Sequence, residues 1–317
     1  MTNAQSVHGP FTHSAFLYRT PQEYLDCLLP FIVDAATADQ AVLVALPEPN
    51  LAMVAEGLGR LAADVVMTDL TEAGRNPGRI LGELLSGFAE KHRDHPVCII
   101  GEPVWPGRSE AEYPACVQHE ALINRAFTGR DITVVCPYAV AQLDPDVIAD
   151  ARCTHPVLWQ DGSFEQDNPA YDPDTMWTRY NQPLSSDPAA VRYTARKMAD
   201  LSGARAFAGS YAQWFGMSSQ KAADLQLIAN ELATSSLTVA GATCRLALWQ
   251  SDGHLVCEAR DRVFLDDPMA GRRPYASDTD RGRGLYVVNA VADLVRTHTT
   301  ATETTIHAYL RLQDANQ

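Results

Sequence analysis

Short apolar runs alternate with stretches of helical spacing through the first half of the chain. The runs are long enough to form buried strands, and they cover 41–46, 64–70, 97–104 and 132–138. The stretches of helical spacing cover 21–37, 50–60, 77–92, 110–128 and 144–152. This alternation predicts an α/β fold with a doubly wound, mostly parallel sheet and helices on both faces. Sheets of this kind bind ligands at the carboxyl ends of their strands.

The alternation stops between about 160 and 188, where the chain is polar and punctuated by proline. Pro169 and Pro173 each follow an Asn or Asp, and Asp187 before Pro188 is typical of a helix start. We therefore expect a first domain over 1–160, a linker over 161–187 and a second domain over 188–317.

The second domain has helical patterns first and strand patterns afterwards. Helical spacing covers 188–201, 203–215 and 218–238, and a further short helix is expected over 285–294. Strand-like runs cover 243–250, 254–260, 295–300 and 304–311, with a turn at Gly253 between the first two. Helices followed by antiparallel strands predict a two-layer α/β sandwich.

The composition is that of an ordinary soluble protein, with 317 residues, 46% hydrophobic and 20% charged. The longest apolar runs, such as 41–46, are far shorter than the ~20 residues that cross a bilayer. The first residues lack the basic and apolar regions of a secretory signal, so we expect a cytoplasmic protein that does not contact a membrane. The seven cysteines form no CxxC pair, and no Cys/His group has ligand spacing. We therefore expect reduced core thiols rather than a zinc site.

The net charge of −14 lies in the first half. Residues 1–180 contain 11 Lys and Arg against 25 Asp and Glu, which is a net charge of −14. Residues 181–317 contain the other 25 − 11 = 14 Lys and Arg and the other 39 − 25 = 14 Asp and Glu, so their charges cancel. An acidic first half repels phosphates, so direct DNA binding is not expected there. In the neutral second half, Arg272, Arg273, Arg281 and Arg283 could receive an anion or form a solvated loop.

Three short segments of the second half carry candidate chemistry. Glu231 and Ser235 are one turn apart on a predicted helix, so they share a face. About thirty residues later, Asp261 ends a predicted strand. Gly282 and Gly284 then precede a helix, whose first N–H groups could point at a phosphate.

The order and spacing of these segments resemble the GHKL family of ATP-binding domains, especially its anti-sigma-factor serine kinases. The resemblance implies a Bergerat-type fold in which Asp261 accepts from adenine and Glu231 is the catalytic base. The nucleotide-binding positions that it implies are Glu231, Ser235, Asp261, Gly282, Gly284 and Thr304.

Two positions depart from the family pattern. Ser235 stands where the family has an asparagine that holds Mg²⁺, and a hydroxyl is a shorter and weaker ligand. Val263 stands where the family has a glycine that lets the backbone approach the base. We therefore expect weak ATP binding, an impaired Mg²⁺ position at Ser235 and impaired kinase activity.

Segments of the first half resemble the MEDS family of sensory domains, which are thought to sense small organic ligands. These segments are 11–18, 74–77, 101–109, 119–124 and 136–138. They contain polar and aromatic residues at predicted strand ends and on the following helix, namely Glu102, Trp105, Arg108, His119, Glu120, Asn124, Cys136 and Tyr138. This set could line one sensory pocket or hold loops to the sheet as an internal network. We interpret His13 and Tyr18 as structural.

Together these features predict a cytoplasmic regulator of transcription that acts by partner switching. Its expected partners are a sigma factor or a STAS-type anti-anti-sigma protein, and it is expected to be a homodimer. Two alternatives stay open. One is an active Mg-ATP-dependent serine/threonine kinase, and the other is a small-molecule binding protein whose second domain dimerises.

Overall fold

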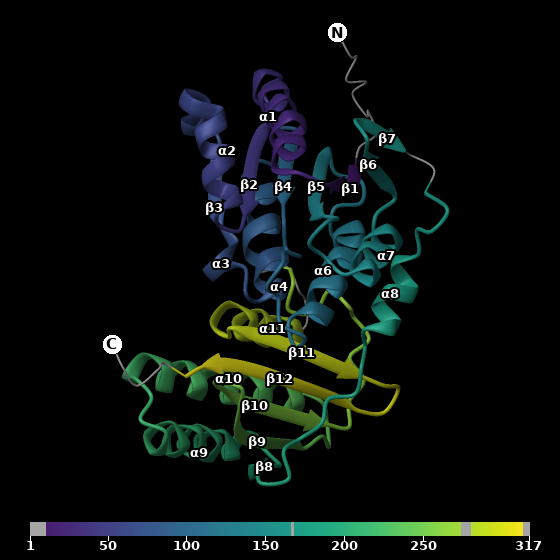
Figure 1. The fold of residues 1–317 in the computed structure, drawn as a ribbon. Helices are drawn as coiled ribbons and strands as arrows, with labels where there is room; N and C mark the ends of the chain where they lie inside the picture. Colours follow the sequence, from purple (N-terminus) through teal and green to yellow (C-terminus); the bar gives the residue numbers. More distant parts are fainter. Residues whose placement is uncertain (1–10, 166–167, 274–279, 313–317) are drawn as a thin grey trace. The chain divides into compact units, whose positions relative to one another are not determined.

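The computed structural model describes residues 11–165, 168–273 and 280–312. These residues form two compact units (Figure 1). The first comprises the chain up to Arg75 together with Leu84–Tyr180, and the second comprises Asn76–Glu83 together with the chain from Asn181 onward. Each unit is described by itself.

Unit 1 is built on a seven-stranded sheet with the order β3-β2-β4-β5-β1-β6-β7. The strands are β1 (Phe11–Tyr18), β2 (Ala41–Leu46), β3 (Val66–Asp69), β4 (Val97–Gly101), β5 (Ile132–Ala139), β6 (Val157–Gln160) and β7 (Ser163–Glu165). Every neighbouring pair is parallel except β6 and β7. The predicted mostly parallel sheet is therefore confirmed, and β1 lies inside it.

Of the helices of the first half, those at Pro21, Asn50, Pro77 and Pro145 begin within one residue of the prediction, the one predicted from 110 begins at Tyr113, and those at Leu70 and Pro173 were not predicted. The helices of this half are α1 (Pro21–Thr37), α2 (Asn50–Leu58), α3 (Leu70–Ala73), α4 (Pro77–Arg79), a π-helical segment (Ile80–Leu85), α5 (Ser86–Lys91), α6 (Tyr113–Ala126), α7 (Pro145–Thr154) and α8 (Pro173–Arg179). Thr20 and Asp144 cap α1 and α7 by accepting from backbone N–H groups of their first turns. α8 and β7 lie within the segment that we assigned to a linker.

Helix α6 is buried on all sides from Pro114 to Asn124. It packs against α7 and α8, and it carries Gln118, His119, Glu120 and Asn124 in this buried stretch. Buried polar side chains must find partners inside the protein, so this helix is where a built polar site is expected.

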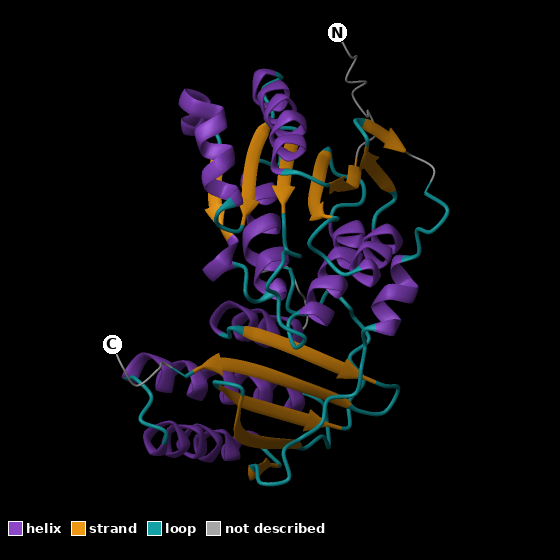
Figure 2. Cartoon of the chain, in the orientation of Figure 1, coloured by secondary structure: helices purple, strands orange, loops and turns teal. Residues whose placement is uncertain are grey.

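Unit 2 contains a five-stranded antiparallel sheet with the order β11-β12-β10-β9-β8 (orange in Figure 2). Its strands are β8 (Val191–Ala195), β9 (Cys244–Ser251), β10 (His254–Asp261), β11 (Leu294–Thr299) and β12 (Thr304–Arg311). The helices α9 (Leu201–Trp214), α10 (Ser219–Leu237) and α11 (Asp280–Val291) share one apolar core with this sheet. The predicted α/β sandwich is confirmed.

The predicted helix over 188–201 is wrong. Val191–Ala195 is instead strand β8, which pairs antiparallel with β9, and a 3-10 turn over Met198–Asp200 leads into α9. The segment combines Val191, Tyr193 and Thr194, which are residue types that fit a pleated strand, and it alternates too briefly to be separated from a helix by spacing.

Among the described residues, no helix is both long and apolar enough to cross a membrane.

Candidate functional site

Helix α10 positions Glu231 and Ser235 in unit 2. Glu231 Oε1 accepts a hydrogen bond of 3.0 Å from Asn230 Nδ2. Ser235 is 4% exposed, and its hydroxyl has no hydrogen-bond partner within the described ranges. A buried hydroxyl without a partner is costly, so Ser235 is the more unusual of the two residues.

Asp261 ends β10 with both carboxylate oxygens in use. Oδ2 accepts from the Ser236 hydroxyl at 2.5 Å, and Oδ1 accepts from the Val263 backbone N–H at 3.1 Å. A carboxylate oxygen can accept more than one hydrogen bond, so these two contacts do not by themselves exclude a further donor.

Thr304 lies opposite Asp261 in the pairing of β12 with β10. Its hydroxyl donates to the Val263 carbonyl at 2.6 Å and lies 3.0 Å from the Thr299 hydroxyl. The backbone N–H of Val263 is therefore bonded to Asp261, and its carbonyl is bonded to Thr304. Valine at 263, where the family pattern has a glycine, is thus accommodated with both backbone groups bonded.

Helix α11 begins at Asp280, earlier than the predicted 285. Gly282 and Gly284 are therefore helical residues rather than a loop before the helix. A Cβ on Gly284 would lie 3.3 Å from the Glu231 backbone oxygen and 3.4 Å from Glu231 Oε2. Glycine at 284 thus allows α11 to lie against the carboxylate of α10. The side chain of Arg281 lies outside the described residues.

These residues fit the two ends of a nucleotide unequally. Asp261 can accept from an adenine amino group. The metal-binding end would have only the short Ser235 hydroxyl in place of an amide oxygen, beside a Glu231 that is bonded to Asn230. The residues therefore suit the adenine ring of a nucleotide better than its metal-bound triphosphate.

Glu102 forms the first polar group of unit 1, at the end of β4. Asn50 Nδ2 donates to both of its oxygens, at 3.1 and 2.9 Å, and the Tyr24 and Tyr18 hydroxyls donate at 3.2 and 3.5 Å. Burial raises the pKa of Glu102 to about 8, although these donors favour the ionised form.

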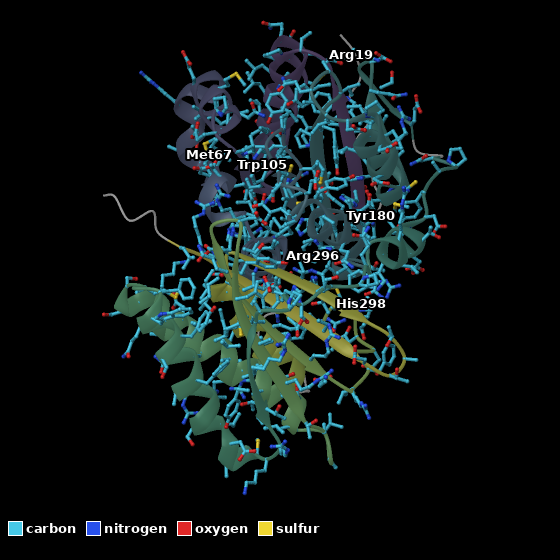
Figure 3. The ribbon with its side chains drawn as sticks, turned by 60° about the horizontal axis from the view of Figure 1, so that its bottom comes forward. Arg19, Met67, Trp105, Tyr180, Arg296 and His298 are labelled. Atoms are coloured by element: carbon cyan, nitrogen blue, oxygen red, sulfur yellow. The ribbon has the colours of Figure 1, made fainter. Side chains whose placement is uncertain are left out.

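Arg108 and Trp105 form the second group. The Arg108 guanidinium lies 3.6 Å from the centre of the Trp105 ring, which is labelled in Figure 3. Arg108 also donates to the carbonyls of Gly74, Arg75 and Pro103 at 2.7–3.0 Å. These contacts tie the backbone at 74–75 and at Pro103 to Arg108, and they use one N–H of each guanidinium nitrogen.

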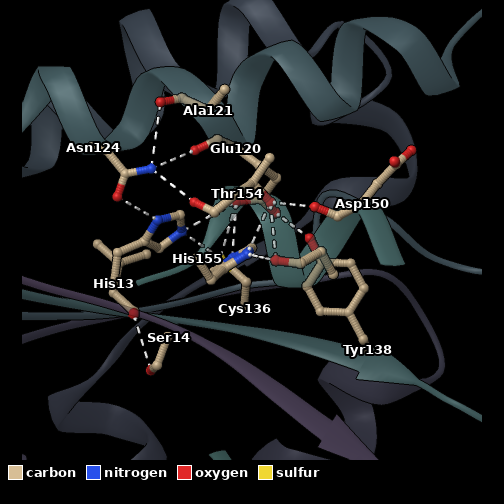
Figure 4. Close-up of polar contacts among 12 residues, drawn as sticks. His13, Ser14, Glu120, Ala121, Asn124, Cys136, Tyr138, Asp150, Thr154 and His155 are labelled. Carbon is tan, nitrogen blue, oxygen red and sulfur yellow. Dashed lines mark hydrogen bonds and ion pairs between the residues drawn. The ribbon is translucent and has the colours of Figure 1, made fainter. Parts of the chain in front are cut away.

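The third group surrounds Glu120 of α6 (Figure 4). His13 of β1 has Nε2 3.2 Å from Glu120 Oε2, and the Tyr138 hydroxyl donates to Oε1 at 3.1 Å. Cys136 Sγ lies 3.4 Å from both Glu120 Oε2 and His13 Nε2. His155, directly after α7, places Nε2 3.4 Å from Glu120 Oε2. His13, Glu120, Cys136 and His155 are each at most 1% exposed, and Tyr138 is 2% exposed.

The charges of this group are strongly coupled. Burial, with the neighbouring His155, lowers the pKa of His13 to about 4. Burial alone would raise the pKa of Glu120, but His155 and His13 hold it well below its usual range. Burial and Glu120 raise the pKa of Cys136, which disfavours a free thiolate nucleophile at this position.

The structure therefore distributes the eight predicted pocket residues over separate groups. Glu120, Asn124, Cys136 and Tyr138 belong together, whereas Glu102 and the Arg108–Trp105 pair make other contacts; His119 is buried in α6. His155 was missed by the sequence reasoning, and His13 was interpreted as structural. The position of β1 inside the sheet brings His13 to Glu120, and local spacing along the chain carries no signal of it.

The two halves match two family models. Residues 12–156 match the model described as MEDS, the MEthanogen/methylotroph, DcmR Sensory domain. Residues 194–310 match the model described as the histidine kinase-like ATPase domain. The predicted order, a MEDS domain followed by a GHKL-type ATPase domain, is confirmed.

Among solved structures, a similar chain occurs in the crystal structure of the SiaB-SiaC complex from Pseudomonas aeruginosa. It is 14% identical with a TM-score of 0.30, over 38% of this chain and 88% of that chain. No curated protein matches the chain.

Proposed function

We propose that the chain is a signalling regulator that acts by partner switching. In this proposal, the MEDS unit receives a small-molecule signal and the ATPase-like unit binds a protein partner. The partner would be a sigma factor or a STAS-type anti-anti-sigma protein, with transcription as the regulated process. Support comes from the order of the two matched families, a sensory domain followed by a histidine kinase-like ATPase domain.

The observation that favours protein binding without catalysis is that the residues at the nucleotide-binding positions are hydrogen-bonded to one another and to their neighbours. Asp261 is bonded to Ser236, Val263 is bonded to Thr304, and Ser235 supplies one short hydroxyl where the family pattern has an amide. Phosphoryl transfer needs a metal ion held in register with the γ-phosphate. The short Ser235 hydroxyl would hold that ion poorly, so catalysis would be impaired before partner binding is. ATP would then bind weakly and act as a ligand rather than a substrate.

An active serine/threonine kinase is the second candidate function. The observation that favours it is Glu231, which keeps the position of the catalytic base and lies against Gly284 of α11. A kinase of this type would use Glu231 to accept the proton of the attacking serine hydroxyl.

A radiolabel transfer assay separates the two functions. The full chain would be incubated with Mg-ATP and a STAS-type protein, beside Glu231→Gln, Ser235→Asn and the double variant Ser235→Asn, Val263→Gly. We expect no transfer above background by the wild type. Binding of the STAS-type protein or sigma factor should persist in the wild type, since that surface does not require turnover.

Two results would contradict the proposal. Robust transfer by the wild type that Glu231→Gln removes would establish the kinase. Binding of neither partner class, with or without ATP, would remove partner switching.

A further inference from the structure

We propose that His13, Glu120, Cys136 and His155 form a buried four-ligand site for a divalent transition-metal ion, with Zn²⁺ as the best fit. The site lies inside unit 1 and does not depend on the proposed function of unit 2. It joins the central strands β1 and β5 to α6 and to the end of α7 (Figure 4).

Four of the six separations between the candidate ligand atoms are those of a tetrahedral site. Zinc bonds of about 2.0–2.3 Å to nitrogen, oxygen and sulfur place tetrahedral ligands about 3.3–3.6 Å apart. Glu120 Oε2 lies 3.2 Å from His13 Nε2 and 3.4 Å from both Cys136 Sγ and His155 Nε2. Cys136 Sγ lies 3.4 Å from His13 Nε2, and all four ligand atoms lie within 4.8 Å of one another.

The surroundings of His13 turn a lone pair toward the site. Asn124 donates through Nδ2 to the carbonyls of Thr154, Glu120 and Ala121, which fixes its Oδ1 as the atom that faces His13 Nδ1 at 3.1 Å. An amide oxygen only accepts, so Nδ1 carries a proton, and in the neutral imidazole Nε2 has the free lone pair. This is the arrangement of a metal-binding histidine with an oriented partner.

The surroundings of His155 do the same. Its Nδ1 lies 2.8 Å from the Ala151 carbonyl, which also requires a proton on Nδ1. In the neutral imidazole, Nε2 is then an acceptor that faces the acceptor Glu120 Oε2, and it has no hydrogen-bond partner within the described ranges. His155 is fully buried, so water does not resolve this pairing of two acceptors. A cation between them does, and the candidates are a metal ion and a proton.

The ligand set selects the type of ion. A thiolate with two imidazoles is a donor set for Zn²⁺ and other borderline transition ions rather than for Mg²⁺ or Ca²⁺. Bound thiolate and carboxylate would together balance the 2+ charge, which allows the site to be buried. The Tyr138 hydroxyl holds Glu120 Oε1, which leaves Oε2 for the ion. Four protein ligands without exposed surface indicate a closed site that stabilises the unit.

Cobalt(II) provides the test, because it occupies zinc sites and reports thiolate ligation by its absorption. The full chain would be stripped with a chelator and titrated with Co²⁺, and the bound Co²⁺ then displaced with Zn²⁺. We expect one Co²⁺ per chain, a tetrahedral spectrum with a thiolate charge-transfer band, and a rise in Tm on Zn²⁺ addition.

Variants locate the site. Cys136→Ser should remove the charge-transfer band, and His155→Gln should weaken Co²⁺ binding at least tenfold. Asn124→Ala should weaken binding about 10–100-fold by releasing the His13 ring. Cys98→Ser, at a buried cysteine of the same sheet outside the group, should leave stoichiometry and spectrum unchanged.

Two results would overturn the proposal. One is a folded wild-type chain that binds no Co²⁺ or Zn²⁺, which would mean that a proton rather than a metal ion lies between the His155 ring and Glu120. The other is a thiolate band that survives in folded Cys136→Ser. If Cys136→Ser does not fold, His155→Gln and Asn124→Ala make the same decision, since unchanged affinity in both would exclude these ligands.

Discussion

Ser236 donates a 2.5 Å hydrogen bond from its hydroxyl to Asp261 Oδ2, while its neighbour Ser235 is equally buried and has an unpartnered hydroxyl in the part of the chain that is described. Both serines are buried, but within the described ranges only the Ser236 hydroxyl has acceptors, Asp261 Oδ2 and the Leu232 carbonyl at 3.2 Å. This contrast separates the contribution of a bonded buried hydroxyl from that of an unbonded one.

Ser236→Ala should lower the free energy of unfolding by about 1–3 kcal/mol, because it leaves a buried carboxylate oxygen without its donor. Ser235→Ala should be neutral or stabilising, because it removes a buried polar group that has no bond to lose. Urea unfolding of the two variants measures the difference. Equal losses in both would show that Ser235 has a partner in solution.

Asp261→Ala should abolish the weak nucleotide binding that we expect, since an adenine donor left unpaired costs about 1–3 kcal/mol. The measurement is calorimetric titration with ATP and ADP, with and without Mg²⁺. Asp266→Asn, at an exposed carboxylate of the following loop, is the matched control and should bind as the wild type does. Tight, Mg²⁺-dependent binding that survives Asp261→Ala would place the nucleotide elsewhere.

Gly271→Ala should destabilise unit 2 more than Gly253→Ala. Both glycines have left-handed backbone, with φ of 77° and 71°, so alanine strains each by about 1–3 kcal/mol. At Gly271 the new Cβ would also lie 2.7 Å from Leu285 Cβ and 2.9 Å from Asn289 Nδ2, whereas at Gly253 nothing lies within 4 Å. The difference between the two losses in free energy of unfolding measures the cost of the close contacts at Gly271. Equal losses in the two variants would contradict the prediction.

Glu102 should make unit 1 less stable as the pH rises. Its folded pKa of about 8 is above the ordinary 4.5, so between these values the folded state binds the extra proton. Stability then falls by up to about 1.4 kcal/mol per pH unit through this window, and the contribution is lost above pH 8.

Urea unfolding at pH 5.5 and 8.5 tests this dependence. Glu102→Gln keeps the shape without a titrating group, so the variant should gain stability relative to the wild type at the higher pH. Glu110→Gln, at an exposed carboxylate, should keep the wild-type slope. If the free energy of unfolding of Glu102→Gln changes with pH as much as that of the wild type, the pH dependence comes from other groups.

The elements of the fold were largely predictable, because buried strands and amphipathic helices leave local signals. The strands predicted over 41–46 and 132–138 are Ala41–Leu46 and Ile132–Ala139, and the helix predicted over 218–238 is Ser219–Leu237. β8 was not predictable in this way, since five residues that pair with a distant strand carry little periodicity of their own.

The sites were less predictable, because partners distant in sequence define them. Glu120 and Cys136 were expected near each other at one end of the sheet, and they are in contact. His155 follows a helix and has no local feature that distinguishes it from a surface histidine. It becomes a candidate ligand only because α7 ends beside α6, and this requires tertiary packing.

The place of β1 in the sheet has a consequence for synthesis of the protein. Ser14 pairs with Val135 on one side and with Val157 on the other, so both neighbours of the first strand are made more than a hundred residues later. A ribosome-bound chain that ends before β5 has an apolar first strand with two open edges, which is a state that invites aggregation. We expect unit 1 to fold as one late event after β6 emerges, and nascent chains shorter than this to depend on chaperones.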